Sequence, residues 1–417
     1  MSEPFDLDVE RVVPGGAGLG RLDGRVVLVE GGLPGDRVRA ISVSESPRLV
    51  QGVLREVLVP GPVRRSTAEM CPLAASRLCG GCDWNGARLD AHRELKTALV
   101  TDALRRLGGL ANVPPLRFHA SPPGYRLRNR LHVDGAGAIG FYAPRSNTVA
   151  PLSSACEIGS PAFLARLSSA PISLPAGELR TLESLDGRTV LAELLLAGQS
   201  SPEAAVTQLR RVFDGARVSD SEGRVLAEDG PTTLSLPAGG AAFTVSVSSF
   251  FQGNRYLLDA FLNEVVLGFD GVSSRGAAWD LYAGAGFLSW PLLARGFRVT
   301  AVEPDGASSA DLATNARAFG AAGFTRLATV RGTAESFLAK ARGPVDVSVA
   351  DPPRAGLSPA VRAALLRLRP QALVLVSCDP ATLARDVKAL AARYEVADGA
   401  LLDLFPITHH VETVLQL

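Results

Sequence analysis

The sequence predicts a multidomain α/β protein built from three successive parts. Residues 1–62 contain short β-rich runs separated by glycine turns, a pattern typical of a small β-barrel. From residue 243 to residue 417, apolar strands alternate with helical segments, which indicates a doubly wound, parallel sheet. Residues 63–242 lie between these parts and form a central α+β region that holds four spaced cysteines. With 417 residues and 47% hydrophobic content, the chain can bury two or three cores.

The N-terminal part carries the strand-like runs GRVVLVE and RVRAISVS next to the turns GGAGLGRLDG and GGLPGDR. Pro60 and Pro62 mark a linker after it. The segment Gly15–Arg21, followed by a valine-rich strand and the GLPGD turn, resembles the TRAM domain. This resemblance implies an OB-like barrel that binds RNA.

Cysteine is rare, and its placement is informative. Cys79 and Cys82 place two thiols on one tight Gly-Gly turn, and Cys71 and Cys156 would complete a set of four sulfur ligands. Zinc ribbons usually repeat the close pair, so one close pair with two separated cysteines favours an iron–sulfur cluster. Zinc, disulfides and unrelated core cysteines remain alternatives. The fifth cysteine, Cys378, stands apart at the end of an apolar run.

The central part contains a helical stretch at residues 87–108 and a segment that could face phosphates. Its strand-like run alternates basic residues, which would share one face: Arg126, Arg128, Arg130 and His132. The net charge is only +1, but the first 130 residues are basic and the remainder is slightly acidic. This charge difference permits an N-terminal region that binds a polyanion. A solvated strand face is the alternative explanation of the alternating basic residues.

The sequence gives no sign of export or of a membrane segment. The first residues lack a basic region followed by an apolar stretch, and no run of 18 apolar residues occurs. We therefore expect a cytoplasmic protein, in which thiols stay reduced and metal binding is favoured over disulfides. We also expect it to be monomeric.

The start of the C-terminal part has the pattern of a nucleoside site. The strand in AAWDLYAGAGF runs into a G-x-G turn, and the next strand ends at Glu303, whose carboxylate can accept both ribose hydroxyls. A dinucleotide site wants a third glycine to seat a pyrophosphate, whereas this run continues with Phe287. The segment Asp280–Gly286 is similar to the first motif of adenosylmethionine-dependent methyltransferases, with Glu303 as the ribose-binding acid. The alternative is that the glycines only turn the chain.

Three further signals stand at strand ends in this part. VDVSVADPPRAGL and ALVLVSCDPATLARD predict strands that end at Asp351 and Cys378, and ligands bind at the carboxyl ends of such strands. Beside a cofactor site, Cys378 is a candidate reactive thiol. The final segment places Glu412 at the start of a closing strand. We interpret His409 and His410 as mainly structural, because neither has a spaced metal partner.

Four motifs together resemble the RNA uracil-5-methyltransferase family. They are Asp351–Arg354 (DPPR), Ser377–Pro380 (SCDP), His410–Val414 (HVETV) and Phe251–Asn254 (FQGN). With the TRAM-like barrel and the cysteine quartet, the resemblance covers almost the whole chain. The quartet is the pattern of family members that carry a 4Fe-4S cluster. Many of these act on 23S ribosomal RNA, and other members act on the T-loop of transfer RNA.

The resemblance implies a role for each motif residue. Cys378 is the nucleophile that adds to carbon 6 of uracil, which makes carbon 5 electron-rich, and Glu412 is the base that later removes the proton from carbon 5. The implied S-adenosylmethionine pocket is lined by Gln252, Tyr282, Phe287, Glu303 and Asp351, with Phe287 standing where an asparagine is often found. The implied cofactors are S-adenosylmethionine and a 4Fe-4S cluster held by the quartet. The expected partner is structured RNA, 23S rRNA more than tRNA, whose target base must leave its stack.

Three other classes of protein share part of this pattern. Amino-methyltransferases also carry D-P-P but normally follow it with an aromatic residue, whereas this chain has Arg354. Radical adenosylmethionine enzymes usually use C-x3-C-x2-C, which differs from the spacing found here. A metal-stapled RNA-binding protein with an inactive methyltransferase domain would bind RNA without transferring methyl groups.

Overall fold

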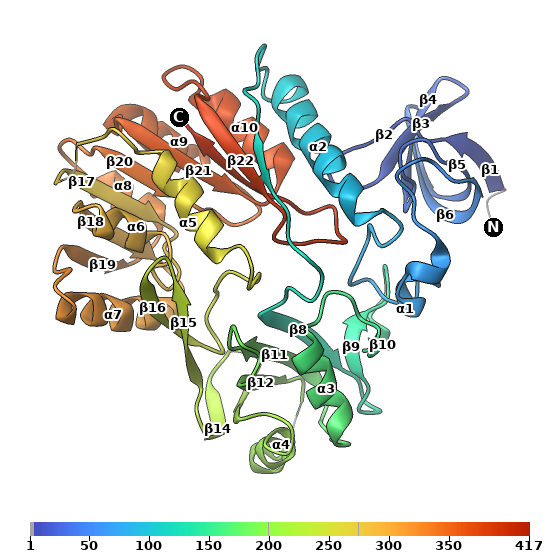
Figure 1. The fold of residues 1–417 in the computed structure, drawn as a ribbon, viewed down its shortest axis with the longest axis horizontal. Helices are drawn as coiled ribbons and strands as arrows, with labels where there is room; N and C mark the ends of the chain where they lie inside the picture. Colours follow the sequence, from blue (N-terminus) through green and yellow to red (C-terminus); the bar gives the residue numbers. More distant parts are fainter. Residues whose placement is uncertain (1–3, 199, 274) are drawn as a thin grey trace.

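Three large β-sheets and one hairpin organise the described chain (Figure 1). A computed structural model describes residues 4–198, 200–273 and 275–417. The three sheets follow one another along the sequence, except that a short strand at residues 117–119 joins the last sheet. The DPPR, SCDP and HVETV motifs lie at strand ends of the last sheet. The cysteine quartet lies on the segments between the first and second sheets and just after strand β10 of the second.

The N-terminal sheet has six strands in the order β1-β5-β6-β4-β3-β2 and curls into a half-barrel (Figure 1). Its strands are β1 (Pro4–Asp8), β2 (Arg11–Val12), β3 (Gly18–Leu22), β4 (Arg25–Glu30), β5 (Arg37–Glu45) and β6 (Leu49–Val59). Alternate residues such as Val27, Val29 and Val38 face inward and are fully buried. This period-2 burial agrees with the predicted small β-barrel, although the sheet closes only in part.

The central sheet has seven strands in the order β10-β9-β8-β11-β12-β13-β14. They are β8 (Arg128–Val133), β9 (Ile139–Tyr142), β10 (Val149–Pro151), β11 (Gly177–Glu183), β12 (Val190–Leu196), β13 (Gly215–Ser219) and β14 (Val225–Asp229), and helices α3 (Pro161–Ser169) and α4 (Pro202–Leu209) pack on them. Short turns carry the preceding cysteine segment: η1 (Thr67–Glu69), α1 (Pro72–Ala75) and η2 (Leu89–Ala91).

A hairpin of β15 (Thr233–Ala238) and β16 (Ala241–Ser246) joins the central and C-terminal sheets. Asn315 fixes it, because its side-chain oxygen accepts from Thr244 N at 2.7 Å and its amide nitrogen donates to the carbonyls of Thr244 and Ala285. The expected boundary between residues 242 and 243 falls inside this hairpin, so the change of sheet begins about ten residues earlier in the chain.

The C-terminal sheet has eight strands in the order β19-β18-β17-β20-β21-β23-β22-β7. The parallel strands are β17 (Ala277–Leu281), β18 (Arg298–Glu303), β19 (Leu327–Arg331), β20 (Val347–Ala350) and β21 (Ala372–Ser377), followed by β22 (Asp398–Leu402) and β23 (Glu412–Gln416). Its helices are α5 (Leu258–Leu267), α6 (Ser289–Ala294), α7 (Gly306–Ala321), α8 (Ala334–Lys340), α9 (Pro359–Leu368) and α10 (Pro380–Leu390). β23 runs antiparallel to both neighbours, which differs from a purely parallel sheet.

One strand and one helix from the predicted central part join the C-terminal domain: the strand pairs with its sheet, and the helix packs on that sheet's core. Strand β7 (Arg117–His119) pairs in parallel with β22, and helix α2 (His92–Arg106) packs beside α10 (Figure 1). Val100, Ala103 and Leu104 of α2 are buried in the same core as β20 and β21. The helix predicted at residues 87–108 is confirmed, but it covers the last sheet and not the central one.

Local sequence explains where several helices begin. Ser160, Ser358 and Asp379 each precede a proline and cap the helix that follows, accepting a backbone N–H three residues later. Proline at the first helical position needs no N–H donor and has the φ of a helix. The cap at Asp379 ends β21 and starts α10, so Cys378 is held between a strand end and a helix cap.

Lys96 on α2 makes a buried ion pair that holds the loop between β22 and β23. The side chain is fully buried; its ammonium lies 2.5 Å from Asp403 and donates to the carbonyls of Phe405 at 3.1 Å and His410 at 2.6 Å. Three acceptors offset the cost of removing the charge from water.

We expect Lys96→Met to lower the free energy of unfolding by about 3–5 kcal/mol, because it leaves Asp403 buried without its partner. Denaturant unfolding of the purified protein measures this. Arg106→Ala is the matched control: its pair with Asp102 lies on the surface, with Arg106 64% exposed. The control should change stability by less than about 0.5 kcal/mol. Equal unfolding midpoints for the two variants would contradict a stabilising role of the Lys96–Asp403 ion pair.

Candidate active site

The residues predicted for methyl transfer meet at one edge of the C-terminal sheet. Glu303 ends β18, Asp351 follows β20 and Cys378 follows β21, and these strands run in parallel. The carboxyl ends of parallel strands share one edge, where α/β folds bind ligands. The strand order therefore brings these three residues to one edge of the sheet, as the strand pattern predicts.

Strand pairing brings Cys378 opposite Glu412. β23 is antiparallel to β21, and the last paired residues are Ser377 and Thr413. The next position on each strand is Cys378 and Glu412, so the register itself places the thiol beside the carboxyl group. Glu412 is only 5% exposed, and its Oε1 atom has no hydrogen-bond partner among the described residues. A buried acceptor without a partner is available to a proton or to a ligand.

Charges at this edge act on one another. Burial raises the pKa of Cys378 to about 12, and the negative charge of Glu412 adds to this shift, whereas Arg354 opposes it. Burial also raises the pKa of Glu412 well above its usual value, with Asp351 adding to the shift and Arg354 again opposing it. The free site therefore favours a neutral thiol and a protonated Glu412, and a cation placed beside them favours ionisation.

Gln252 and Asp351 contact each other across the site. Gln252 Nε2 donates to Asp351 Oδ2 at 3.3 Å; burial raises the pKa of Asp351 to about 7, and this hydrogen bond opposes the rise. Asn254, two residues on, is fully buried and donates to Ser121 Oγ and the Leu404 carbonyl, which fixes the FQGN segment. A Cβ at Gly253 would meet no atom within 4 Å, so open space adjoins this segment.

The glycine turn after β17 has the backbone geometry that its sequence predicts. Gly284 and Gly286 have φ values of +55° and +90°, and Tyr282 before them has +67°. Gly284 N donates to Glu303 at 2.8 Å, and a Cβ at Gly284 would meet no atom within 4 Å. A backbone N–H, a carboxylate and open space thus stand together, as a nucleoside site requires.

The Phe287 side chain packs in the core under the site: it is 5% exposed and meets Phe251 and Phe261 edge-on. Its contact with a cofactor stays a prediction. Asp280, the first residue of the Asp280–Gly286 motif, is fully buried. Burial raises its pKa to about 7, and a 2.6 Å hydrogen bond from Ser289 opposes the rise. Its position inside an apolar strand is the sequence feature that indicates a buried aspartate.

The four spaced cysteines lie in one neighbourhood. Burial raises the pKa of Cys79, Cys82 and Cys156, and each thiol also feels the charge of others in the set, which includes Cys71. All five cysteines of the chain are described and none forms a disulfide. Over the described ranges, however, no three His, Cys, Asp or Glu side chains are arranged as a metal site. The quartet is brought together without the geometry of bound metal.

The Gly-Gly turn between Cys79 and Cys82 packs directly on β9. Gly80 N donates to the Tyr142 carbonyl at 2.9 Å, and a Cβ at Gly80 would lie 2.8 Å from that same oxygen. Any other residue at Gly80 would push the turn away from the sheet. The donor set itself, four thiols on tight turns with a guanidinium nearby, fits an iron–sulfur cluster.

The basic row predicted to face phosphates does not act as one surface. Arg126 lies over the Phe141 ring at 5.3 Å, and its charge opposes the rise that burial causes in the pKa of the neighbouring Cys79 and Cys82 thiols. Arg128 donates to the Val247 carbonyl at 3.0 Å, and burial lowers its pKa to about 10. Only Arg130 of the three arginines is exposed, and it pairs with Glu178. This expectation is corrected because Arg126 and Arg128 are half-buried and their guanidinium groups are engaged within the fold.

His132, the fourth member of that row, stacks on Tyr142 with ring centroids 3.6 Å apart. The two C-terminal histidines have different partners. His409 pairs with Asp83 beside Cys82, and His410 Nε2 lies 3.0 Å from Arg354 Nη2. His410 therefore adjoins the site, whereas His409 ties the C-terminal loop to the cysteine segment.

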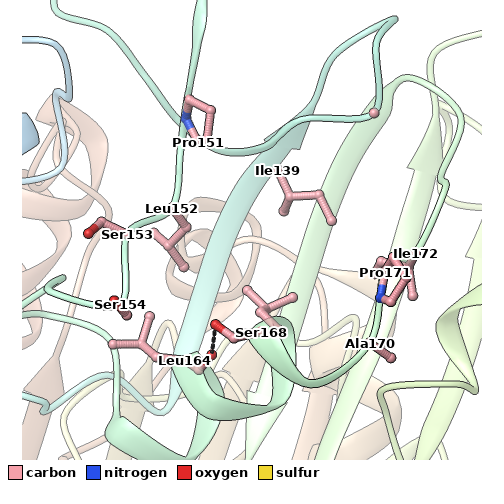
Figure 2. A pocket seen from close by; sticks show the side chains of 12 residues that line it. Ile139, Pro151, Leu152, Ser153, Ser154, Leu164, Ser168, Ala170, Pro171 and Ile172 are labelled. Carbon is pink, nitrogen blue, oxygen red and sulfur yellow. Dashed lines mark hydrogen bonds between the residues drawn. The ribbon is translucent and has the colours of Figure 1, made fainter.

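Among the cavities of the described residues, two lie beside the central sheet and the half-barrel, away from the edge that holds Cys378 and Glu412. One, of about 250 Å³, is bounded by β9, β10 and α3 and includes Ile139, Leu152 and Leu164 (Figure 2). The other, of about 540 Å³, separates the half-barrel from the cysteine segment and is lined by Arg55, Arg77 and Cys79 among others. In the described parts of the chain, no helix has the length and apolar character needed to cross a membrane.

Comparison with known proteins gives consistent results. The model of the tRNA (uracil-5-)-methyltransferase family matches residues 241–417. An uncharacterised RNA methyltransferase from Corynebacterium efficiens is 33% identical, over 99% of this chain and 94% of its own length. Another from Nitratidesulfovibrio vulgaris is 30% identical, over 99% of this chain and 95% of its own.

A solved structure resembles the whole chain. It is the Pyrococcus abyssi tRNA (uracil-54, C5)-methyltransferase in complex with S-adenosyl-L-homocysteine, with a TM-score of 0.72, 22% identity, and coverage of 98% of this chain and 99% of that one. At this identity the likeness establishes the fold. The half-barrel, the central sheet and the C-terminal sheet are thus a shared architecture.

At pH values alkaline enough to ionise Glu412, we expect Glu412→Gln to speed alkylation of Cys378, because it removes a negative charge that adds to the burial-raised pKa of the thiol. A rise of about 3- to 10-fold at alkaline pH corresponds to a pKa lowered by up to one unit. Peptide mass spectrometry after iodoacetamide treatment measures this. Glu395→Gln, an exposed glutamate in the same part of the chain, serves as the control. Unchanged alkylation in Glu412→Gln would show that the two groups do not interact.

Proposed function

Because the chain belongs to the S-adenosylmethionine-dependent RNA (uracil-5-)-methyltransferase family, we propose that it methylates carbon 5 of a uridine in structured RNA through a covalent Cys378 adduct. The observation that carries the proposal is the strand register that sets Cys378 opposite Glu412. A nucleophile and a base on neighbouring strands can act on adjacent carbons of one ring.

Each residue has one task in this reaction. The Cys378 thiolate forms a bond to carbon 6, and the electrons of the carbon 5–carbon 6 double bond move into the ring as an enolate. Carbon 5 of the enolate would then bond to the methyl group of S-adenosylmethionine as the sulfur–methyl bond breaks and S-adenosylhomocysteine leaves. Glu412, ionised once substrate is bound, takes the proton from carbon 5, and the electron pair left behind expels the thiolate and restores the double bond. The thiolate takes a proton from solvent, in place of the one it lost before the attack, which returns the site to a neutral thiol and a protonated Glu412.

The proposed cofactor residues are Gln252, Tyr282, Glu303 and Asp351, with Phe287 supporting them from the core. Open space at Gly253 and Gly284 supports this assignment, since a Cβ at either would meet no atom within 4 Å. Glu303 would accept the ribose hydroxyls, as its position at the end of β18 suggests. A sulfonium beside Asp351 would favour its ionised form.

The proposed RNA target is 23S rRNA, on the strength of the cysteine quartet, with tRNA as the second substrate to test. The matching family model names tRNA, and the half-barrel and the 540 Å³ cavity offer arginines for phosphate contacts. Incubation with labelled cofactor and each RNA, followed by mapping of the modified nucleotide, decides between them. Methyl on a base nitrogen would refute the proposed chemistry.

We expect Cys378→Ala to lower methyl transfer by at least about 1,000-fold, because it removes the thiol proposed to add to carbon 6. RNA containing 5-fluorouridine should trap the unaltered protein as a stable adduct, since fluorine cannot leave as the proton does. Glu412→Gln should accumulate an adduct on ordinary RNA, and Glu395→Gln should behave as the unaltered protein. Full turnover by Cys378→Ala would exclude the covalent route. Denaturing gels that resolve protein–RNA adducts give the readout.

We propose further that Cys71, Cys79, Cys82 and Cys156 hold a 4Fe-4S cluster. The support is the all-thiol donor set within mutual electrostatic reach, with Arg126 nearby to offset negative charge. Such a cluster would stabilise the turn that contacts the C-terminal loop through Asp83.

Anaerobically purified protein should contain about four iron and four sulfide per chain and absorb broadly in the visible range. Cys82→Ser should lose both, because it removes one of the four ligands, whereas Cys378→Ser should keep them. Zinc in place of iron, or iron retained in Cys82→Ser, would contradict the assignment. Elemental analysis and sulfide determination give the answer independently of activity.

A further inference from the structure

Arg354 and His410 form a contact at the active-site edge that the proposed reaction does not use. Arg354 lies in the DPPR loop after β20, and its Nη2 atom is 3.0 Å from His410 Nε2. His410 stands two residues before Glu412 on the loop that enters β23. The two residues come from segments 56 positions apart and meet beside the thiol and the carboxyl group.

His410 is held in place on several sides. Its carbonyl accepts from Lys96 Nζ at 2.6 Å, and its backbone N–H donates to Thr408 Oγ1 at 3.2 Å. The ring meets Phe405 edge-on at 6.0 Å and lies 4.0 Å from the His409 ring, measured between centroids. Arg354, by contrast, is exposed and can move away if nothing holds it.

The direction of the hydrogen bond follows from chemistry. A guanidinium can only donate, so His410 Nε2 must accept and must carry no proton. Burial lowers the pKa of His410 to about 3, with the charges of His409 and Arg354 adding to the shift and Asp83 opposing it, which keeps the ring neutral. The proton of the neutral ring then sits on Nδ1.

Arg354 acts on both reacting groups. The charged groups that influence Cys378 are Glu412 and Asp351, which disfavour the thiolate, and Arg354, which favours it. Glu412 in turn is influenced by Asp351 and Arg354. A guanidinium fixed at this place opposes the rise in the thiol pKa that burial and the two carboxyl groups cause.

We propose that His410 is a positioning residue whose neutral imidazole holds the Arg354 guanidinium beside Cys378 and Glu412, so that Arg354 stabilises the attacking thiolate. The role rests on the proposed function in assigning Cys378 as the nucleophile. It gives the histidine before Glu412 and the arginine of the DPPR loop a joint task that the motifs alone do not specify.

The test measures alkylation of Cys378 by iodoacetamide in the free protein, by peptide mass spectrometry across neutral to alkaline pH. His410→Ala should slow alkylation about 10-fold below the thiol pKa, which corresponds to a pKa raised by one unit. His410→Gln should stay within about 3-fold of the unaltered protein, because its amide oxygen can accept from Arg354. Arg354→Ala should slow alkylation as much as His410→Ala.

The double variant His410→Ala with Arg354→Ala should lose no more than either single variant, because both remove the same interaction. His132→Ala, which removes a stacked histidine on the central sheet, is the control and should leave Cys378 alkylation unchanged.

An unaltered rate in Arg354→Ala, equal slowing by His410→Gln and His410→Ala, or additive losses in the double variant would overturn the proposal. Arg354 is exposed, so its variant tests the idea even where His410→Ala fails to fold. Alkylation needs neither RNA nor S-adenosylmethionine. Absent methyl transfer with the expected alkylation pattern would therefore refute the proposed function alone.

Discussion

The buried Lys96–Asp403 ion pair is the constraint on which the arrangement of the active site depends. Lys96 comes from α2, early in the chain, and fixes the loop between β22 and β23 through Asp403 and two carbonyls. Glu412 begins the strand directly after this loop. A buried ammonium is stable only while all its acceptors stay in place, so the pair gives the loop one conformation.

Other distant parts of the chain meet on the same loop. Gly16 of the half-barrel lies so close to His409 that a Cβ there would be 2.7 Å from the imidazole ring. Trp84, two residues after Cys82, donates from its backbone N–H to the Ile407 carbonyl and from its indole N–H to the Gly16 carbonyl. The loop therefore connects the half-barrel and the cysteine segment to the strand that carries Glu412.

The acidic side chains of the site favour their protonated forms in the free protein. Asp280 and Glu412 are buried and Asp351 beside them is half-buried, and burial raises the pKa of each. Arg354 offsets part of this negative charge, and a cationic methyl donor, as proposed, would offset more. A thiol that is protonated in the free protein and ionised in the complex is protected from adventitious oxidation.

Sequence alone determined the order of the parts, the strand ends that carry Glu303, Asp351 and Cys378, the glycine turn and a helix at residues 87–108, which the structure has as His92–Arg106. These features depend on local periodicity, on capping and on the rule that parallel strands end at one edge, so no distant partner is needed to predict them. Tertiary structure decided the partial burial of Arg126 and Arg128, the place of Phe287 in the core, the entry of β7 into the last sheet and the contact between Arg354 and His410. Long side chains take the partner that best offsets their desolvation, and that partner can lie anywhere in the sequence.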